Sequence, residues 1–265
     1  MLKSKTKLAL VVSDTHVGST VGLWPESFTA AEGHTITGNP FQQWLWSCWS
    51  NMQTWAATVI GDDPHELVLN GDLVDGIHHK TLQVMTADPG DQSEAVKHIL
   101  GPLAEKAAAV HTILGTECHT RNDECRIGRY LGSSKDPVTK QSAWNSLDVE
   151  YHGCLCNFAH HISATARPYL EASAHSIALG AMTMSRARTG KRVPSVIVRG
   201  HRHRHGIWTD GNLLSVTLGA WQGLTRYGYK VVPDAVPQPS VVILDWRRAD
   251  KGELPLVHQR VYTAE

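Results

Sequence analysis

The sequence predicts an α/β fold in which two stacked, mixed β-sheets are flanked by helices. Short apolar segments alternate with segments of helical periodicity over most of the chain, and the C-terminal part contains mainly strands. Hydrophobic residues make up 42% and charged residues 19% of the 265 residues, which is typical of a globular protein and excludes a disordered chain or a fibre. We expect one domain over residues 1–265, with the Pro-rich segment 232–240 as a surface loop.

The first expected strand covers residues 7–12, because its apolar run is interrupted by Ser13 and Asp14. That run is shorter than the roughly 7 to 15 apolar residues of an export signal. No other segment has the length of a membrane span. The five cysteines are scattered and odd in number, which favours a reducing compartment. We therefore expect a cytoplasmic protein without a membrane partner.

The first long helix is expected from Phe41, where apolar residues begin to recur at intervals of three and four. Asn39 and Pro40 suit its cap and first turn, and its tryptophans are expected in the core. Further along the chain, glycines or turn residues bound each apolar run. The remaining expected elements are strand 66–70, helix 91–110, strand 111–114, helix 122–131, strands 147–151 and 155–159, helix 167–188, and strands 195–199, 213–218, 241–246 and 256–262.

The net charge disfavours a nucleic-acid-binding protein, whereas the histidine content favours a metal-binding one. Lys plus Arg and Asp plus Glu both total 25, so the net charge is zero, whereas a chain that grips nucleic acid by its phosphates is normally basic. Histidine is abundant, with 16 residues. Because imidazole is the commonest side-chain metal ligand, this composition favours a metal site.

Metal-ligand residue types follow five of the expected strands. In open α/β sheets, ligands bind beyond the carboxyl ends of the strands, so these clusters can meet in one crevice. The clusters are Asp14-Thr-His16, Gly71-Asp72-Leu-Val-Asp75, Gly115-Thr-Glu117-Cys-His119, His160-His161 and Gly200-His201-Arg-His203. By chance, Gly-His-x-His is expected about 0.08 times and Gly-Asp-x-x-Asp about 0.06 times in such a chain. Their joint occurrence, each at a strand end, predicts a metal centre.

The spacing within these clusters favours a site with two cations. Residues two apart at a strand end project to the same side, so Asp14 and His16 can hold one cation together. In the same way His201 and His203, in an extended segment, can each face one metal. A carboxylate such as Asp72 can bridge two cations about 3.5 to 4 Å apart. Mixed carboxylate and imidazole ligands suit Mn, Fe, Zn or Ni, of which we favour Mn.

The order of motifs resembles that of the calcineurin-like metallophosphoesterases, two-metal hydrolases of phosphate esters with a four-layer sandwich of sheets and helices. The resemblance covers residues 14–203. It implies that one metal is bound by Asp14, His16, Asp72 and His203. It implies that the other is bound by Asp72, by His160 with His161 as the alternative, and by His201.

The third motif departs from the family pattern, in which a ligand Asn directly precedes a catalytic His. Here Gly115 is followed by Thr116, Glu117 and Cys118 before His119. We expect Glu117 to replace the Asn, because a carboxylate binds these cations better than the hydroxyl of Thr116, and His119 to act as the acid. Phage-type members of the family look similar at this motif. Asp75 is expected to orient a ligand by hydrogen bonds rather than bind a metal.

The resemblance implies a phosphoesterase with two divalent metal ions, in which a hydroxide held between the metals attacks phosphorus in line. The expected partner is a phosphate ester substrate, with phosphodiesters of a nucleotide or nucleic acid favoured because no separate cap domain is evident. The expected selectivity rim is formed by the loops 18–40 and 76–90. Three alternatives remain open: a nuclease of the same family, a phosphomonoesterase, and a metal-binding module without turnover.

Overall fold

Strand β2 (Leu8–Val12) lies in the middle of a five-stranded sheet and is buried on both faces. The computed structural model describes residues 1–78, 81–120, 123–162, 171–231 and 236–263. Side chains alternate across a strand. Leu8 and Leu10 therefore join the core under the helices, whereas Ala9 and Val11 join the core between the two sheets. The apolar run at the N-terminus thus requires a layer on each side.

The described residues form strands and helices in the following order. The strands are β1 (Leu2–Lys3), β2 (Leu8–Val12), β3 (Ser27–Thr29), β4 (Thr35–Thr37), β5 (Glu66–Leu69), β6 (Ala109–Thr112), β7 (Leu147–Tyr151), β8 (Cys154–Phe158), β9 (Val196–Arg199), β10 (Gly206–Asp210), β11 (Leu213–Thr217), β12 (Ser240–Asp245) and β13 (Leu256–Val261). The helices are α1 (Pro40–Ile60), α2 (Pro89–Ala104), α3 (Glu117–Thr120), α4 (Asp123–Tyr130), α5 (Glu171–Arg188) and α6 (Arg226–Val231).

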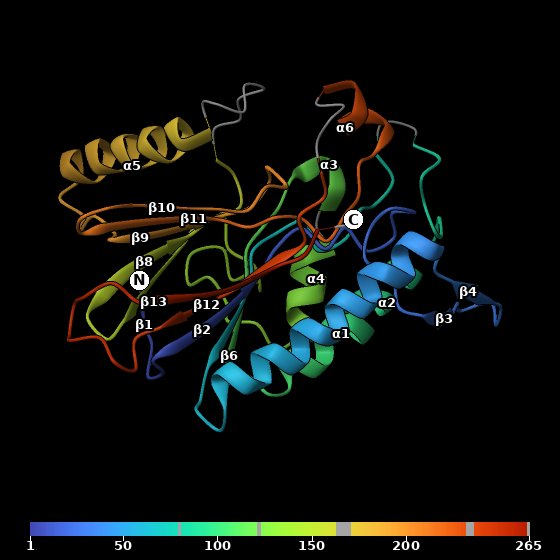
Figure 1. The fold of residues 1–265 in the computed structure, drawn as a ribbon, viewed down its shortest axis with the longest axis horizontal. Helices are drawn as coiled ribbons and strands as arrows, with labels where there is room; N and C mark the ends of the chain where they lie inside the picture. The colour runs from blue at the N-terminus through green and yellow to red at the C-terminus, as the bar shows by residue number, and fades with distance from the viewer. Residues whose placement is uncertain (79–80, 121–122, 163–170, 232–235, 264–265) are drawn as a thin grey trace.

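Two mixed sheets form the centre of the fold (Figure 1). Among the described residues, the five-stranded sheet has the order β13-β12-β2-β5-β6 and the six-stranded sheet the order β1-β7-β8-β9-β11-β10. Strands β2, β5 and β6 run parallel, and β12 is antiparallel to β2. Helices α1 and α2 lie on the side of the five-stranded sheet and α5 on the side of the six-stranded sheet (Figure 1). The predicted α/β class, with two mixed sheets flanked by helices, is confirmed.

Helix α5 is held on the six-stranded sheet by polar contacts. Arg186 donates two hydrogen bonds to the carboxylate of Asp148, with N–O distances of 2.6 and 2.9 Å. The Nδ1 atom of His175 lies 2.6 Å from the hydroxyl oxygen of Ser215 on β11. These contacts fix the helix on the outer face of the sheet.

Several expected boundaries differ from the structure. The helix expected over 91–110 begins at Pro89 and ends at Ala104, with Pro102 inside its last turn. Residues 109 and 110 instead begin β6, where they pair with β5. The β3–β4 hairpin lies in a segment that was expected to be a loop, and β10 was not predicted.

Some predictions concern residues outside the described part of the chain. These are the first residue of the helix expected over 122–131, the first four of the helix expected over 167–188, and residues 232–235 of the expected surface loop. Within the described ranges, no helix combines the length and apolar character needed to cross a membrane.

Helix α1 begins with the cap that the sequence predicts. The side chain of Asn39 accepts a hydrogen bond from the amide of Gln42, and the side chain of Gln42 accepts one from the amide of Asn39. This reciprocal pair is a capping box, and Pro40 occupies the first helical turn. Trp49, which is fully buried, then anchors the middle of the helix in the core.

We expect Asn39→Ala to lower the free energy of unfolding by about 1 kcal/mol, because it leaves an amide of the first turn without its acceptor. Ser50→Ala, in the exposed middle of the same helix, is the control and should change stability by less than about 0.5 kcal/mol. Urea unfolding followed by circular dichroism measures both. Equal stability of the two variants would show that the cap contributes nothing.

Candidate metal centre

The candidate residues of the two sheets meet beyond the carboxyl ends of their strands. The loop after β2 continues to pair with the loop after β5, because the amide of Asp14 donates to Gly71 O at 2.9 Å and that of His16 to Asp72 O at 3.0 Å. His160 follows β8 and His201 follows β9, and both of these strands belong to the six-stranded sheet. The site therefore lies where the edges of both sheets come together.

The backbone at the candidate ligands has an uncommon conformation. Seven non-glycine residues of the described chain have a positive φ, and five of them are candidate ligands. These five are Asp14 (54°), His16 (43°), Asp72 (51°), His201 (70°) and His203 (58°). Such angles cost free energy in residues with a Cβ and cluster at functional sites. The chain is thus not extended at these residues, and left-handed turns, rather than strand alternation, bring the paired side chains together.

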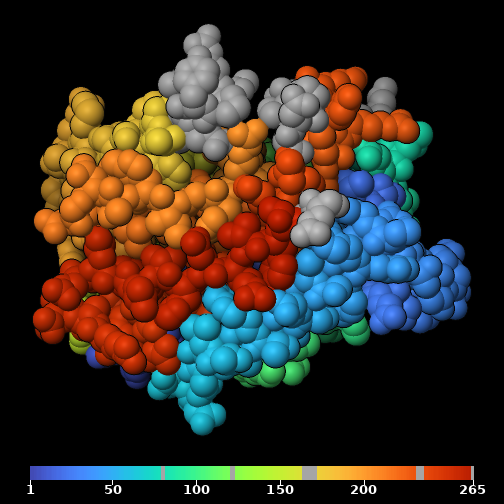
Figure 2. Space-filling view, in the orientation of Figure 1, coloured from blue at the N-terminus to red at the C-terminus, as the bar shows by residue number. Residues whose placement is uncertain are grey.

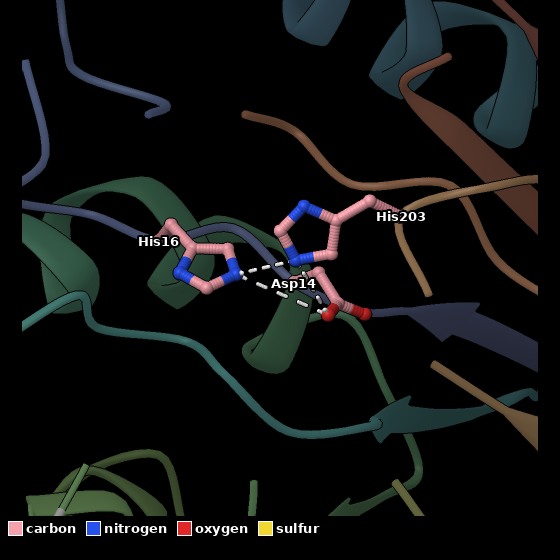
Figure 3. A group of neighbouring side chains, drawn as sticks. All are labelled: Asp14, His16 and His203. Atoms are coloured by element: carbon pink, nitrogen blue, oxygen red, sulfur yellow. Dashed lines mark hydrogen bonds and ion pairs between the residues drawn. The ribbon is translucent and has the colours of Figure 1, made fainter. Parts of the chain in front are cut away.

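Asp14, His16 and His203 form one group of potential ligands (Figure 3). The Nε2 atoms of the two histidines lie 3.1 Å apart. Asp14 Oδ1 lies 3.9 Å from His16 Nε2 and 3.5 Å from His203 Nε2. Figure 3 shows both rings turned toward the carboxylate.

Asp72, His160 and His201 form a second group. His160 Nε2 lies 2.9 Å from Asp72 Oδ2. The hydroxyl oxygen of Thr116 lies between the other two members, 3.0 Å from Asp72 Oδ2 and 3.1 Å from His201 Nδ1. This group combines one carboxylate, two imidazoles and one hydroxyl.

The two groups are adjacent, and Asp72 lies between them. Asp72 Oδ2 is 4.0 Å from His16 Nε2 of the first group. In the opposite direction, His160 Nε2 is 3.8 Å from Asp14 Oδ1. All four of these side chains are buried. The arrangement therefore matches the two-ligand-set geometry that the sequence leads us to expect, with one carboxylate facing both sets.

Contacts with Asn70 and Asp75, outside the two groups, determine which ring nitrogen of His160 and of His16 faces the site. His160 Nδ1 donates to the carbonyl of Asn70 at 2.8 Å, and His16 Nδ1 lies 3.0 Å from Asp75 Oδ1. In the neutral rings, the Nε2 lone pairs therefore point into the site, as in metal-binding histidines. Asp75 has the orienting position expected from the sequence.

Electrostatics in the second group favour a cation. Burial opposes charge on His160, yet the nearby Asp14 and Asp72 carboxylates raise the pKa of His160 to about 10. Burial and the neighbouring His160 lower the pKa of His201 to about 4, so this imidazole is neutral at pH 7. The buried carboxylates thus favour positive charge beside them, and the neutral imidazole of His201 offers a lone pair. Both features fit a divalent cation.

Glycines in the motifs allow the close approach of the loops. A Cβ at Gly115 would collide with the carboxylate and backbone nitrogen of Asp72, and one at Gly200 would collide with Ser13 and Asp14. Glycine at these two positions is therefore required by packing against the candidate ligands.

Glu117 is not brought into either group. It is the first residue of α3, and its side chain is exposed. Thr116 instead donates its amide to Asp72 Oδ1 at 2.6 Å, which directs its hydroxyl into the second group. Because successive helical residues are rotated by about 100°, the next side chain points away. The structure thus favours Thr116 over Glu117, contrary to the sequence-based expectation.

His161 and His119 lie at the border of the site. His161 is exposed and is in neither group, although its ring centroid is 4.7 Å from that of His201. His119 Nδ1 lies 3.2 Å from the carbonyl oxygen of Asp75 and 3.4 Å from its Oδ1 atom. Burial alone would lower the pKa of His119, but Asp75 and Asp72 raise it above its ordinary value. Asp75 and Asp72 thus favour the protonated form of His119.

Two supporting residues were not singled out from the sequence. Buried Glu124 of α4 accepts hydrogen bonds from the amides of Leu73 and Gly115, so it ties two site loops together. Burial and the nearby Asp72 raise the pKa of Glu124 to about 7. Gln222 donates to Asp75 Oδ1 at 3.2 Å. A single Glu or Gln carries no motif, so only spatial proximity reveals either role.

A separate cavity of about 820 Å³ lies beside α2 and is lined by His98 and Tyr130, among others. None of the candidate ligands lines it. This cavity is therefore distinct from the candidate metal centre.

No protein-family model matches the chain, and no curated protein matches it in sequence. Among solved structures, it is similar to vacuolar protein sorting 29 from Cryptosporidium parvum, at 13% identity and a TM-score of 0.46, over 98% of this chain and 99% of that one. It is also similar to an archaeal phosphodiesterase, at 12% identity and a TM-score of 0.45, over 96% and 99%. A third is Vps29 from Entamoeba histolytica complexed with zinc, at 11% identity and a TM-score of 0.40, over 97% and 98%. These likenesses are too weak to assign an activity.

We expect Asp72→Ala to abolish binding of both metals, because it removes the carboxylate that faces both ligand groups. Asp62→Ala, at an exposed position outside the site, is the matched control and should retain full occupancy. Elemental analysis after dialysis against Mn measures both. Two tightly bound metals in Asp72→Ala would contradict the bridging position.

We expect Thr116→Val to weaken the second metal while the first stays bound, because the substitution removes the hydroxyl next to Asp72 and His201. Glu117→Gln should leave both occupancies unchanged, because its side chain is exposed. Metal titration followed by calorimetry separates the two sites. Loss of the second metal in Glu117→Gln would restore the sequence-based assignment.

Proposed function

We propose that the protein is a phosphoesterase that uses two divalent metal ions, with Mn favoured, and hydrolyses phosphodiester bonds. The observation that carries this proposal is the position of Asp72 between two groups of lone-pair donors, whose backbone is held in left-handed turns. Strained, buried and highly charged clusters of this kind are typical of functional sites.

In this proposal, Asp14, His16, Asp72 and His203 would hold one cation. Asp72, His160, His201 and Thr116 would hold the other. When bound, such cations lower the pKa of water and stabilise negative charge on phosphoryl oxygens. The chain itself keeps the imidazole lone pairs turned inward, through the contacts of His16 with Asp75 and of His160 with Asn70.

His119 is proposed to donate a proton to the leaving alkoxide. Its Nδ1 atom faces Asp75, so its Nε2 atom would carry the transferred proton. Asp75 stabilises the protonated ring and fixes its orientation, because it contacts His119 and His16 at the same time. No side-chain nucleophile is required, since water supplies the attacking oxygen.

Phosphodiesters are favoured over monoesters. The sequence offers no segment long enough for a separate cap domain between the elements of the two sheets. A substrate with a second ester group could therefore extend across the surface. Gly76 lies next to the site, because it approaches the backbone of His119.

The proposal is tested by metal analysis of the purified protein together with hydrolysis of bis- and mono-p-nitrophenyl phosphate in added Mn, Ni, Zn or Mg. We expect two bound metals and faster hydrolysis of the diester. Faster hydrolysis of the monoester would indicate a phosphomonoesterase. Two bound metals with no turnover of either ester would indicate a metal-binding module.

We expect His119→Ala to retain both metals but to lose about 10²- to 10⁴-fold in kcat on an ester with a poor leaving group, the usual contribution of a positioned proton donor. The loss should be smaller for p-nitrophenyl esters, because p-nitrophenolate needs little protonation. His34→Ala, at an exposed histidine, is the control. An equal loss on both esters would instead assign His119 to stabilisation of the phosphoryl oxygens.

A further inference from the structure

Helix α6 exposes two large aromatic side chains between two cations. Its sequence is Arg-Tyr-Gly-Tyr-Lys-Val. Tyr227 is 75% exposed and Tyr229 is 63% exposed. Arg226 and Lys230 are exposed as well. Tyrosine normally buries its ring, so two open rings on one short helix indicate a surface for binding.

The segment before α6 is attached to the candidate metal centre. The amide of Trp221 donates to the carbonyl of Asp14 at 2.9 Å, and Gln222 contacts Asp75. Consecutive Cα atoms are about 3.8 Å apart, so Arg226 lies within about 15 Å of Gln222. The amide of Arg226 is held by Gln83 Oε1 at 3.0 Å. Helix α6 therefore stands at the rim of the site, and Figure 2 shows it at the molecular surface.

The charged residues of α6 itself are both cations, although the net charge of the chain is zero. They are Arg226 and Lys230, and the nearest acidic residue along the chain is Asp234. These two cations are four residues apart, so they project from the same side of the helix. This spacing suits two phosphates of one backbone.

We propose that α6 is a binding element for single-stranded nucleic acid, a conclusion that rests on the proposed phosphodiesterase function. Bases stack on exposed aromatic rings and phosphates pair with Arg and Lys, which is how single strands are bound without sequence preference. The target phosphodiester would lie at the metal centre while neighbouring nucleotides contact α6.

The geometry of α6 fits a strand better than an anionic membrane. Tyr227 and Tyr229 are two residues apart, about 200° around the helix. Two rings on nearly opposite sides cannot both insert into a flat bilayer. They can stack on two bases of a flexible chain that bends around the helix.

The test measures binding of a fluorescent single-stranded oligonucleotide of about 15 nucleotides by anisotropy, in EDTA so that hydrolysis does not interfere. The double variant Tyr227→Ala/Tyr229→Ala should lose about 5- to 150-fold in affinity for each tyrosine that stacks on a base. Arg226→Ala/Lys230→Ala should reduce the slope of log K against log salt by about 1.4, the value for two phosphates of a single strand.

Tyr130→Ala is the matched control, because Tyr130 is 54% exposed on α4 and lines the separate cavity. It should leave oligonucleotide binding unchanged, and circular dichroism should show that every variant is folded. Unchanged affinity in both α6 variants would overturn the proposal. So would variants that lose binding to vesicles of anionic phospholipid while they retain the oligonucleotide.

Failure of the proposed function gives a different result. Suppose that the wild-type protein with added metal hydrolysed no phosphate ester, but the α6 variants still lost affinity for the oligonucleotide. The proposal that α6 binds single strands would then be supported, and the proposed phosphodiesterase function would be wrong. If the wild-type protein hydrolysed bis-p-nitrophenyl phosphate but did not bind the oligonucleotide, only the inference about α6 would be wrong.

Discussion

The carboxylate of Asp72 connects the loops on which the site is built. Asp72 follows β5, and its two oxygens contact Thr116 after β6 and His160 after β8. It also lies 4.0 Å from His16 after β2. Because β8 belongs to the other sheet, this single carboxylate joins both sheets at their carboxyl ends. A buried carboxylate in such a position needs positive charge beside it, and this requirement explains why histidines surround it.

The strained backbone of the site depends on the core beneath it. Left-handed φ angles at five candidate ligands each cost free energy. The loops that contain these residues start from β2, β5 and β9, whose residues are all buried. Burial of these apolar strands between the sheets and under the helices offsets the strain. Glu124 adds a local support, because it accepts amide hydrogens from two of the loops.

The distribution of charge separates the site from the rest of the molecule. The net charge of zero argued at first against nucleic acid as a partner. That average conceals two cations on α6, Arg226 and Lys230, and an accumulation of carboxylates and imidazoles at the strand ends. The segment that leads to α6 is attached to the candidate metal centre, because the amide of Trp221 donates to the carbonyl of Asp14.

The sequence by itself determined the layers of the fold and most of the residues that meet at the site. The uninterrupted apolar run of β2 requires a layer on each side of it, and glycines mark where the strands end next to Asp72 and His201. Only the tertiary structure shows that Thr116, rather than Glu117, contacts Asp72. The start of α3 turns one side chain toward Asp72 and the next toward solvent, and residue spacing cannot reveal that direction. The left-handed turns at the ligands, and the contacts of Asp75 with both His16 and His119, likewise arise from loops of distant strands that pack against each other.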